Sequence, residues 1–181
     1  RQRQMCIRDS DITELLNLGK KNQLEVKVAK ESANRSINAA ERKADWWLFG
    51  GIYRPVWLEV LPQIHMKHFV LSADHKGKFQ ASIDMEGDAK GHEIVVSVRS
   101  LKDGKTVYTS NGQTTITHPI NNSGKEQMIS GEWTNIVPWS TEAPNLYVVK
   151  LELKNPEGKI VQTRETRIGF RTVEFFPQDG V

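Results

Sequence analysis

Segments of strand length in which apolar and polar residues alternate occupy most of the second half of the chain. The apolar residues of three such segments fall on one parity: Phe79, Ala81, Ile83 and Met85; Ile94, Val96 and Val98; and Tyr147, Val149, Leu151 and Leu153. A period of two is typical of β-strands that bury one face. Turn sequences separate the segments at 102–105 (KDGK) and 155–158 (NPEG). Because no long amphipathic helix lies between them, the pattern predicts an antiparallel β-sandwich of about seven strands.

The first third of the chain has a less regular pattern. Residues 11–18 combine a capping side chain, a carboxylate three residues later and three leucines, which predicts one short helical turn. Leu24, Val26 and Val28 alternate with charged residues and predict a strand with one buried face. The polar residues 30–44 that follow predict a loop.

Residues 45–60 (DWWLFGGIYRPVWLEV) are the densest apolar block of the chain. The glycine pair at 50–51 predicts a loop or bulge that leads into a strand beginning at Ile52. Pro55 places that strand at a sheet edge, because proline donates no ladder hydrogen bond. Arg54 shares the parity of apolar neighbours, so we expect a buried, structural guanidinium that needs a carboxylate or carbonyl partner.

Composition and charge exclude several classes of function. The 181 residues include 25 Lys plus Arg and 22 Asp plus Glu, for a formal net charge of +3, and the two signs are interleaved. We therefore expect no nucleic-acid partner. No stretch approaches the ~20 apolar residues of a membrane helix, and no signal peptide is recognisable. This predicts a soluble piece without a membrane partner and leaves the compartment open, a periplasmic or secreted parent included.

Metal and cofactor chemistry is not expected either. A single cysteine, Cys6, and five scattered histidines exclude a disulfide framework and a Cys/His zinc site. His65 and His68 are three apart on a predicted strand, so their side chains are expected to point to opposite faces and to share no metal. Residues 1–10 (RQRQMCIRDS) lack helical or strand periodicity. Two interpretations stay open for them, a foreign segment and a disordered natural terminus.

Two blocks of the sequence resemble one enzyme family. Residues 45–59 (DWWLFGGIYRPVWLE) resemble the end of the N-terminal sugar-binding sandwich of the family 2 glycoside hydrolases, which include β-galactosidases, β-glucuronidases and β-mannosidases. Residues 139–147 (WSTEAPNLY), followed by 165–171 (ETRIGFR), resemble the close of the same family's immunoglobulin-like domain. The blocks stand in the family's order, and with their flanks the resemblance covers nearly everything after Ser10.

The resemblance implies how the chain is divided. Residues 11–61 are expected to be the C-terminal part of a jelly-roll, galactose-binding-like sandwich, and residues 62–174 an immunoglobulin-like β-sandwich. Residues 175–181 are expected to begin a linker to a (β/α)8 barrel, which in the family holds both catalytic carboxylates and lies beyond this sequence. We therefore nominate no catalytic residue and expect no hydrolysis by this chain alone. Carbohydrate is expected as a partner within the full enzyme, where the sandwich docks against the barrel.

Asp45 is the one carboxylate with an expected role at a substrate. By resemblance, the matching aspartate of the β-galactosidase branch reaches into the barrel's substrate pocket, and the position of Trp47 is likewise aromatic. A carboxylate can accept hydrogen bonds from sugar hydroxyls while the rings of Trp46 and Trp47 cover the apolar face of a pyranose. The alternative is that Asp45 caps a turn and that the tryptophans are core residues.

Four further residues are expected to be structural. Trp139, Pro144 and Tyr147 are predicted to form a packed corner of the immunoglobulin-like sandwich, with the tyrosine hydroxyl bonded back to the chain as in a tyrosine corner. Gly169 lies inside the predicted last strand. There it marks a bulge or a close backbone approach rather than a phosphate loop.

Three functions fit these observations. The first is a non-catalytic fragment of a family 2 glycoside hydrolase with β-galactosidase-like activity on O-glycosyl bonds, acting as scaffold and edge of the substrate pocket. In that fragment the predicted strands at 24–28 and 46–60 lack partners, so exposed apolar surface and self-association are expected. The second is a stand-alone carbohydrate-binding module that uses the platform of Asp45, Trp46 and Trp47. The third is a fibronectin-like protein-binding sandwich, for which the sequence offers no distinctive patch.

Overall fold

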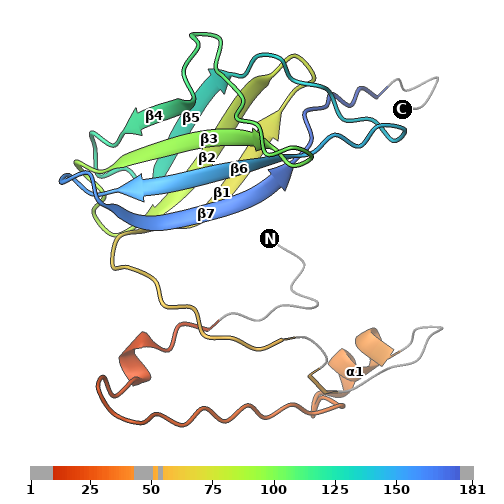
Figure 1. Cartoon of the computed structure of the whole chain (residues 1–181). Coiled ribbons are helices and arrows are strands. Elements are labelled where there is room, and N and C mark those ends of the chain that lie inside the picture. The colour runs from red at the N-terminus through yellow and green to blue at the C-terminus, as the bar shows by residue number, and fades with distance from the viewer. Residues whose placement is uncertain (1–9, 43–50, 53–54, 176–181) are drawn as a thin grey trace. The chain divides into compact units, whose positions relative to one another are not determined.

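The computed structural model describes residues 10–42, 51–52 and 55–175. The chain divides into two units, the first ending at Leu58 and the second beginning at Glu59, near the predicted domain boundary. Each unit is described by itself. Figure 1 shows the second unit as a β-sandwich of two layers.

Antiparallel strands build both layers of the sandwich. Within the described residues these are β1 (His65–Ala73), β2 (Lys78–Glu86), β3 (Glu93–Ser100), β4 (Thr115–Pro119), β5 (Glu126–Glu132), β6 (Tyr147–Lys154) and β7 (Ile160–Ile168). One sheet has the order β1-β2-β5 and the other the order β4-β3-β6-β7. Because β3 pairs with β6 rather than with β2, the connections follow the Greek-key pattern of immunoglobulin-like sandwiches. The predicted all-β fold class is confirmed.

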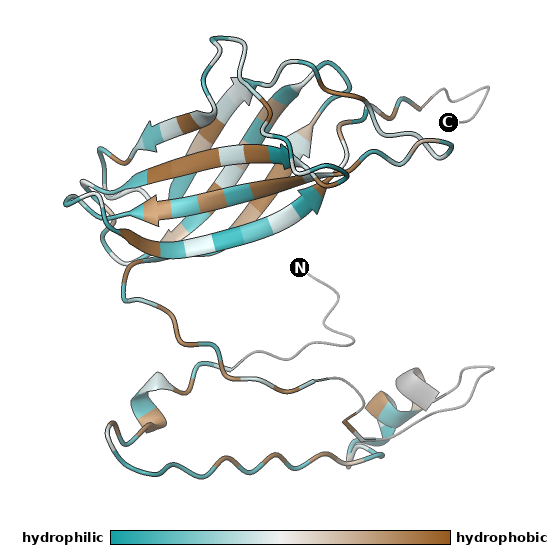
Figure 2. Cartoon of the chain, in the orientation of Figure 1, coloured by the Kyte–Doolittle hydropathy of each residue, from teal (hydrophilic) through white to brown (hydrophobic). Residues whose placement is uncertain are grey.

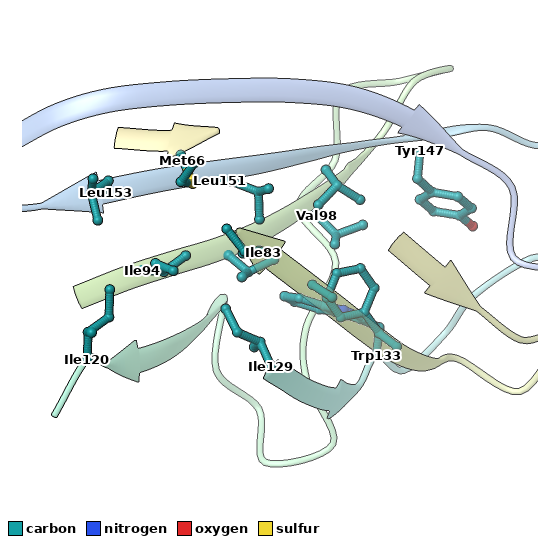
Figure 3. Packing of buried hydrophobic residues seen from close by; sticks show 14 of the residues in the cluster. Met66, Ile83, Ile94, Val98, Ile120, Ile129, Trp133, Tyr147, Leu151 and Leu153 are labelled. Atoms are coloured by element: carbon teal, nitrogen blue, oxygen red, sulfur yellow. The ribbon is translucent and has the colours of Figure 1, made fainter. Parts of the chain in front are cut away.

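The two sheets enclose one hydrophobic core. The register places Val96 of β3 opposite Leu151 of β6, and Ala81 of β2 opposite Ile129 of β5. All three apolar parities predicted from the sequence point into this core and are buried. Figure 3 shows such side chains meeting between the sheets, and Figure 2 shows hydrophilic residues between the apolar ones along the strands. Each large side chain that is fully buried contributes about 1.5–3 kcal/mol to stability.

Both predicted turns are present. The turn at 102–105 is closed by a hydrogen bond from the Ser100 N–H to the Lys105 carbonyl (2.8 Å). The turn at 155–158 joins β6 to β7, and its last residue, Gly158, has a φ of +78°. A left-handed backbone of this kind favours glycine, which explains the residue at that position.

A side chain of β7 forms hydrogen bonds with backbone groups of β1, in the opposite sheet. These groups lie next to a β-bulge in β1, between Met66 and His68. Gln162 of β7 is buried, and its amide oxygen accepts a hydrogen bond from the Met66 N–H (2.6 Å). The amide NH2 of Gln162 donates to the Met66 carbonyl (3.4 Å). These bonds satisfy buried backbone groups of an edge strand and tie β1 to β7.

The first unit has helical turns and no strand among its described residues. The 3-10 helix η1 (Thr13–Leu15) confirms the predicted helical turn. The predicted loop at 30–44 is wrong, because α1 (Arg35–Arg42) lies within it. The side chain of Asn34 is the reason: its oxygen accepts a hydrogen bond from the Ser36 N–H (2.9 Å) and caps the first turn.

The predicted strands at 24–28 and from Ile52 onward are also wrong for the described residues. Both segments have a strand-like sequence pattern, but no strand among the described residues is hydrogen-bonded to them. A strand is stable when its backbone groups are paired in a sheet, which these segments lack. Their apolar side chains are consequently exposed, among them Leu24, Val26, Val28, Val56, Trp57, Leu58 and Val60. Across the described ranges, no helix has the length and apolarity needed to span a bilayer.

Candidate functional site at the Trp139 corner

The residues expected to contact sugar lie outside the described residues. These are Asp45, Trp46 and Trp47, and the same holds for Arg54. The candidate site with described geometry is the corner where the segment before β6 meets the end of β7. We call it the Trp139 corner, and it consists of Val137, Trp139, Tyr147, Gly169, Phe170 and Arg171.

Trp139 packs directly on the backbone of Gly169. A Cβ atom at Gly169 would lie 2.8 Å from both Cβ and Cγ of the Trp139 side chain, so the position has no room for one. The Trp139 N–H donates a hydrogen bond to the Phe170 carbonyl (2.9 Å). Gly169 follows β7, which ends at Ile168, instead of lying inside the strand. The glycine therefore permits a close approach at the end of the sheet.

Tyr147 is buried on the inner side of this corner. Its hydroxyl accepts a hydrogen bond from the Val137 N–H (2.9 Å) and donates to the Val137 carbonyl (3.4 Å). Its ring packs edge-on against Phe170, with centroids 5.2 Å apart and planes at 88°. Pro144, assigned to the same packed corner by the sequence analysis, is exposed. The neighbouring Asn145 makes the contact instead, donating to the Pro138 carbonyl (3.1 Å).

Arg171 completes the corner, a role that its place in the 165–171 block does not predict. Its guanidinium carbon lies 5.1 Å from the centre of the Trp139 ring, within cation–π range. The backbone N–H of Arg171 donates a hydrogen bond to the Ala73 carbonyl at the end of β1 (3.2 Å). One residue on, the Thr172 hydroxyl lies 2.6 Å from Nδ1 of His75. These contacts hold residues 169–172 against both sheets. The Trp139 corner therefore has a structural role.

Replacing Tyr147 by phenylalanine tests how much the hydroxyl contributes to this corner. We expect Tyr147→Phe to lower the free energy of unfolding by about 1 kcal/mol, because the pair of bonds to Val137 is lost while the ring packing stays. Tyr108→Phe is the matched control, since Tyr108 is half exposed and its hydroxyl makes no hydrogen bond within the described residues. Urea denaturation followed by far-UV circular dichroism measures both variants. Equal losses in the two variants would contradict a special role for Tyr147.

Hydrogen bonds lower the pKa of four carboxyl groups in the sandwich. The Lys67 side chain lowers the pKa of the exposed Glu86, and the Thr141 hydroxyl lowers the pKa of the exposed Glu142. Desolvation acts to raise the pKa of the half-buried Asp74, but bonds from the backbone N–H groups of Lys78 and Lys76 outweigh it and lower that pKa. The hydrogen bond from the Ser100 side chain, with further bonds from Lys105, lowers the pKa of Asp103 to about 2. A general acid in glycoside hydrolysis needs a raised pKa. None of these four groups therefore has the raised pKa of a general acid.

The β-bulge in β1 corrects the expectation for the two histidines. His65 lies opposite Glu86, and His68 lies opposite Asp84. Glu86 and Asp84 are two apart on β2, so both histidines lie on the same face, because the bulge inserts one extra residue between them. No group of three or more metal-binding side chains occurs in the described part of the chain.

The sandwich coincides with the part of the chain that matches a known protein family. The family model for the glycosyl hydrolases family 2 matches residues 63–171. This range contains every strand of the sandwich, from β1 to β7. The chain belongs to this family. The resemblance seen in the two sequence blocks is confirmed.

Curated relatives include proteins named as β-galactosidases and as putative β-glucuronidases. A β-galactosidase of Priestia megaterium is 30% identical over 136 residues, which cover 72% of this chain and 13% of that protein. A β-galactosidase of Kluyveromyces lactis is 31% identical over 189 residues, covering 94% of this chain and 18% of that protein. The chain thus spans less than a fifth of the length of either relative.

Solved structures of family 2 members share the fold. A member from Bacteroides cellulosilyticus matches with a TM-score of 0.63 at 20% identity, over 94% of this chain and 23% of that chain. A Bacteroides uniformis β-glucuronidase matches with a TM-score of 0.57 at 24% identity, over 82% of this chain and 19% of that chain. At these identities the likeness concerns the fold.

Proposed function

We propose that this chain is a non-catalytic part of a family 2 glycosyl hydrolase that cleaves O-glycosyl bonds in the manner of a β-galactosidase. In this proposal the immunoglobulin-like sandwich is a scaffold that docks a sugar-binding domain against a catalytic barrel. Asp45, with Trp46 and Trp47, forms one edge of the substrate pocket in the assembled enzyme.

The observation that carries the proposal is the coincidence of the family match at 63–171 with the sandwich, together with the small share of its relatives that the chain covers. The chemistry of the described carboxyls supports it. A retaining mechanism uses two carboxyl groups about 5 Å apart in a cleft, one with a raised pKa. Asp84 and Glu126 are cross-strand neighbours, but both are exposed on the outer face of their sheet.

The pocket-edge role of Asp45 predicts that the chain by itself binds sugar weakly. Titration calorimetry with galactosides and glucuronides is expected to give no dissociation constant below about 1 mM, because a few contacts at one pocket edge contribute little affinity. The Asp45→Ala variant is the control and should behave identically. Tighter binding that Asp45→Ala abolishes would contradict the scaffold proposal and favour a stand-alone carbohydrate-binding module.

A further inference from the structure

Arg164 places a cation on the inner side of β7, an edge strand of the sandwich (Figure 1). The register sets Arg164 opposite Leu151 of β6, a core residue that is 1% exposed. Residues directly opposite each other in an antiparallel pair lie on the same face of the sheet. The Arg164 side chain is consequently only 29% exposed. A guanidinium that is largely withdrawn from water needs a partner, because an unpaired buried charge destabilises the fold.

The partner of Arg164 comes from the segment that leads into the sandwich. We call residues 59–64, which directly precede β1, the connector. The Glu59 carboxylate accepts a hydrogen bond from Nη1 of Arg164 (2.5 Å), and the two groups form an ion pair. Among the described residues, Glu59 is the only carboxylate paired with Arg164. The connector thus supplies the negative charge that the inner side of β7 requires.

The connector has a second anchor next to β1. The Pro62 carbonyl accepts a hydrogen bond from Nδ1 of His65 (2.8 Å). The Gln63 carbonyl oxygen lies so close to Gly87 that a Cβ atom there would approach it to 2.7 Å. Ile64 packs against the hydrophobic core. Residues 62–64 are therefore held by the sandwich independently of Glu59.

The stretch between these two anchors has little apolar contact with the sandwich. Val60 is 93% exposed and Leu61 is 38% exposed. Apart from the bond at Glu59, residues 55–61 make no hydrogen bond or ion pair with the described part of the sandwich. The position of residues 59–61 on the sandwich therefore depends on one ion pair.

We propose that the ion pair of Glu59 and Arg164 is a latch that fixes the point at which the chain enters the sandwich. The closed latch holds residues 59–61 at β7, and the open latch frees the chain as far as Pro62. Ion pairs between fully exposed groups are weak, but opening this pair leaves the largely buried Arg164 without a partner, so the closed state dominates.

The latch goes beyond the proposed function, because it depends on neither sugar binding nor hydrolysis. In the assembled enzyme of that proposal, Glu59 and Arg164 are positioning residues. They fix the point from which the segment that carries Asp45 leaves the sandwich.

Pulsed double electron–electron resonance between two nitroxide labels tests the latch in the full chain. In a Cys6→Ser background, one label is attached to Val60→Cys in the connector. The other is attached to Lys102→Cys in the exposed turn after β3. β3 begins at the end of the sandwich where the connector lies and runs about 25 Å to the opposite end, so the labels are well separated. The measured quantity is the width of the distance distribution between them.

The native chain is expected to give a narrow distribution, because residue 60 is held from both sides. Arg164→Gln and Glu59→Gln are each expected to widen it by about 8 Å, the spread of a free tether of two residues that begins at Pro62. Combining both substitutions should widen it no further, because each alone already removes the same contact. Arg164→Lys keeps the charge and should retain most of the narrow distribution.

Arg167→Gln is the matched control. Arg167 lies on the same strand, but it is exposed and forms no ion pair within the described ranges, so its replacement should leave the width unchanged. A broad distribution in the native chain overturns the proposal. Unchanged widths in Arg164→Gln and Glu59→Gln overturn it as well, even if urea denaturation shows a loss of stability, and so does equal widening in Arg167→Gln. Far-UV circular dichroism verifies the sandwich in each variant, and Glu59→Gln lies outside its strands.

Discussion

Replacing Trp133 by alanine is expected to lower the free energy of unfolding by about 3–5 kcal/mol, a large share of the stability of a domain of this size. Trp133 is 1% exposed and follows β5, where its ring packs edge-on against Phe79 with centroids 6.5 Å apart. Its backbone N–H donates a hydrogen bond to the carbonyl of Gly77 (2.9 Å), the residue directly before β2. Removal leaves a cavity that rigid neighbours on both sheets cannot fill. Urea denaturation followed by far-UV circular dichroism measures the loss.

Trp57→Ala is the matched control for this cavity. Trp57 is 69% exposed in the segment before the sandwich. Surface substitutions of this kind change stability by about 0.5 kcal/mol or less. A loss at Trp133 no larger than the loss at Trp57 would contradict the position of Trp133 in the core. Trp133→Phe should fall between the two, because it keeps most of the packing and removes an indole N–H that has no partner within the described residues.

Replacing Gly77 by alanine is expected to cost about 3 kcal/mol or more, for two separate reasons. Gly77 has a φ of +95°, a left-handed backbone that costs a side-chain-bearing residue roughly 1–2 kcal/mol. In addition, a Cβ atom at this position would lie 2.0 Å from the carbonyl oxygen of Trp133. That oxygen belongs to the backbone, so the clash is relieved only by moving β2 and the end of β5 apart. Denaturation midpoints and slopes give the change.

Gly158→Ala isolates the first of these reasons, the left-handed backbone. Gly158 also has a left-handed backbone, with a φ of +78°, but no atom lies within 4 Å of its would-be Cβ. The expected loss is about 1–2 kcal/mol, from backbone conformation alone. If Gly77→Ala cost no more than Gly158→Ala, the close approach between Gly77 and Trp133 would be absent.

The fold of the sandwich follows from the sequence where one face of each strand is buried. The parities of β2, β3 and β6 can be predicted because the inward residues are apolar and most outward ones are polar. Each of the two turns also contains a glycine with a positive φ, Gly104 and Gly158. β7 is harder to read from pattern. Its inward face includes Gln162 and Arg164, which bond to the Met66 backbone and to the Glu59 carboxylate. That these polar residues face inward can be predicted only when their partners, about a hundred positions away in the sequence, are known.

The strand predictions in the first unit failed for a related reason. The alternation of apolar and polar residues at 24–28 indicates which side chains of a strand would face a core. A strand forms, however, only when its backbone groups are hydrogen-bonded to a neighbouring strand. The bulge in β1 shows the same limit, since one inserted residue moved His68 to the face of His65. At the Trp139 corner, Gly169 and Tyr147 were identifiable from residue type and position. The stacking of Arg171 on Trp139 depends on how the chain turns after β7, which no local pattern encodes.

The central claim, that this chain is scaffold without hydrolytic chemistry of its own, is tested most directly by a rate measurement. The 181-residue chain is incubated with nitrophenyl β-galactoside and β-glucuronide, beside an intact family 2 β-galactosidase as positive control. The account predicts turnover below about one-thousandth of a typical enzymatic value of about 10 s⁻¹. Turnover that co-purifies with the chain and disappears in Asp84→Asn or Glu126→Gln would contradict it.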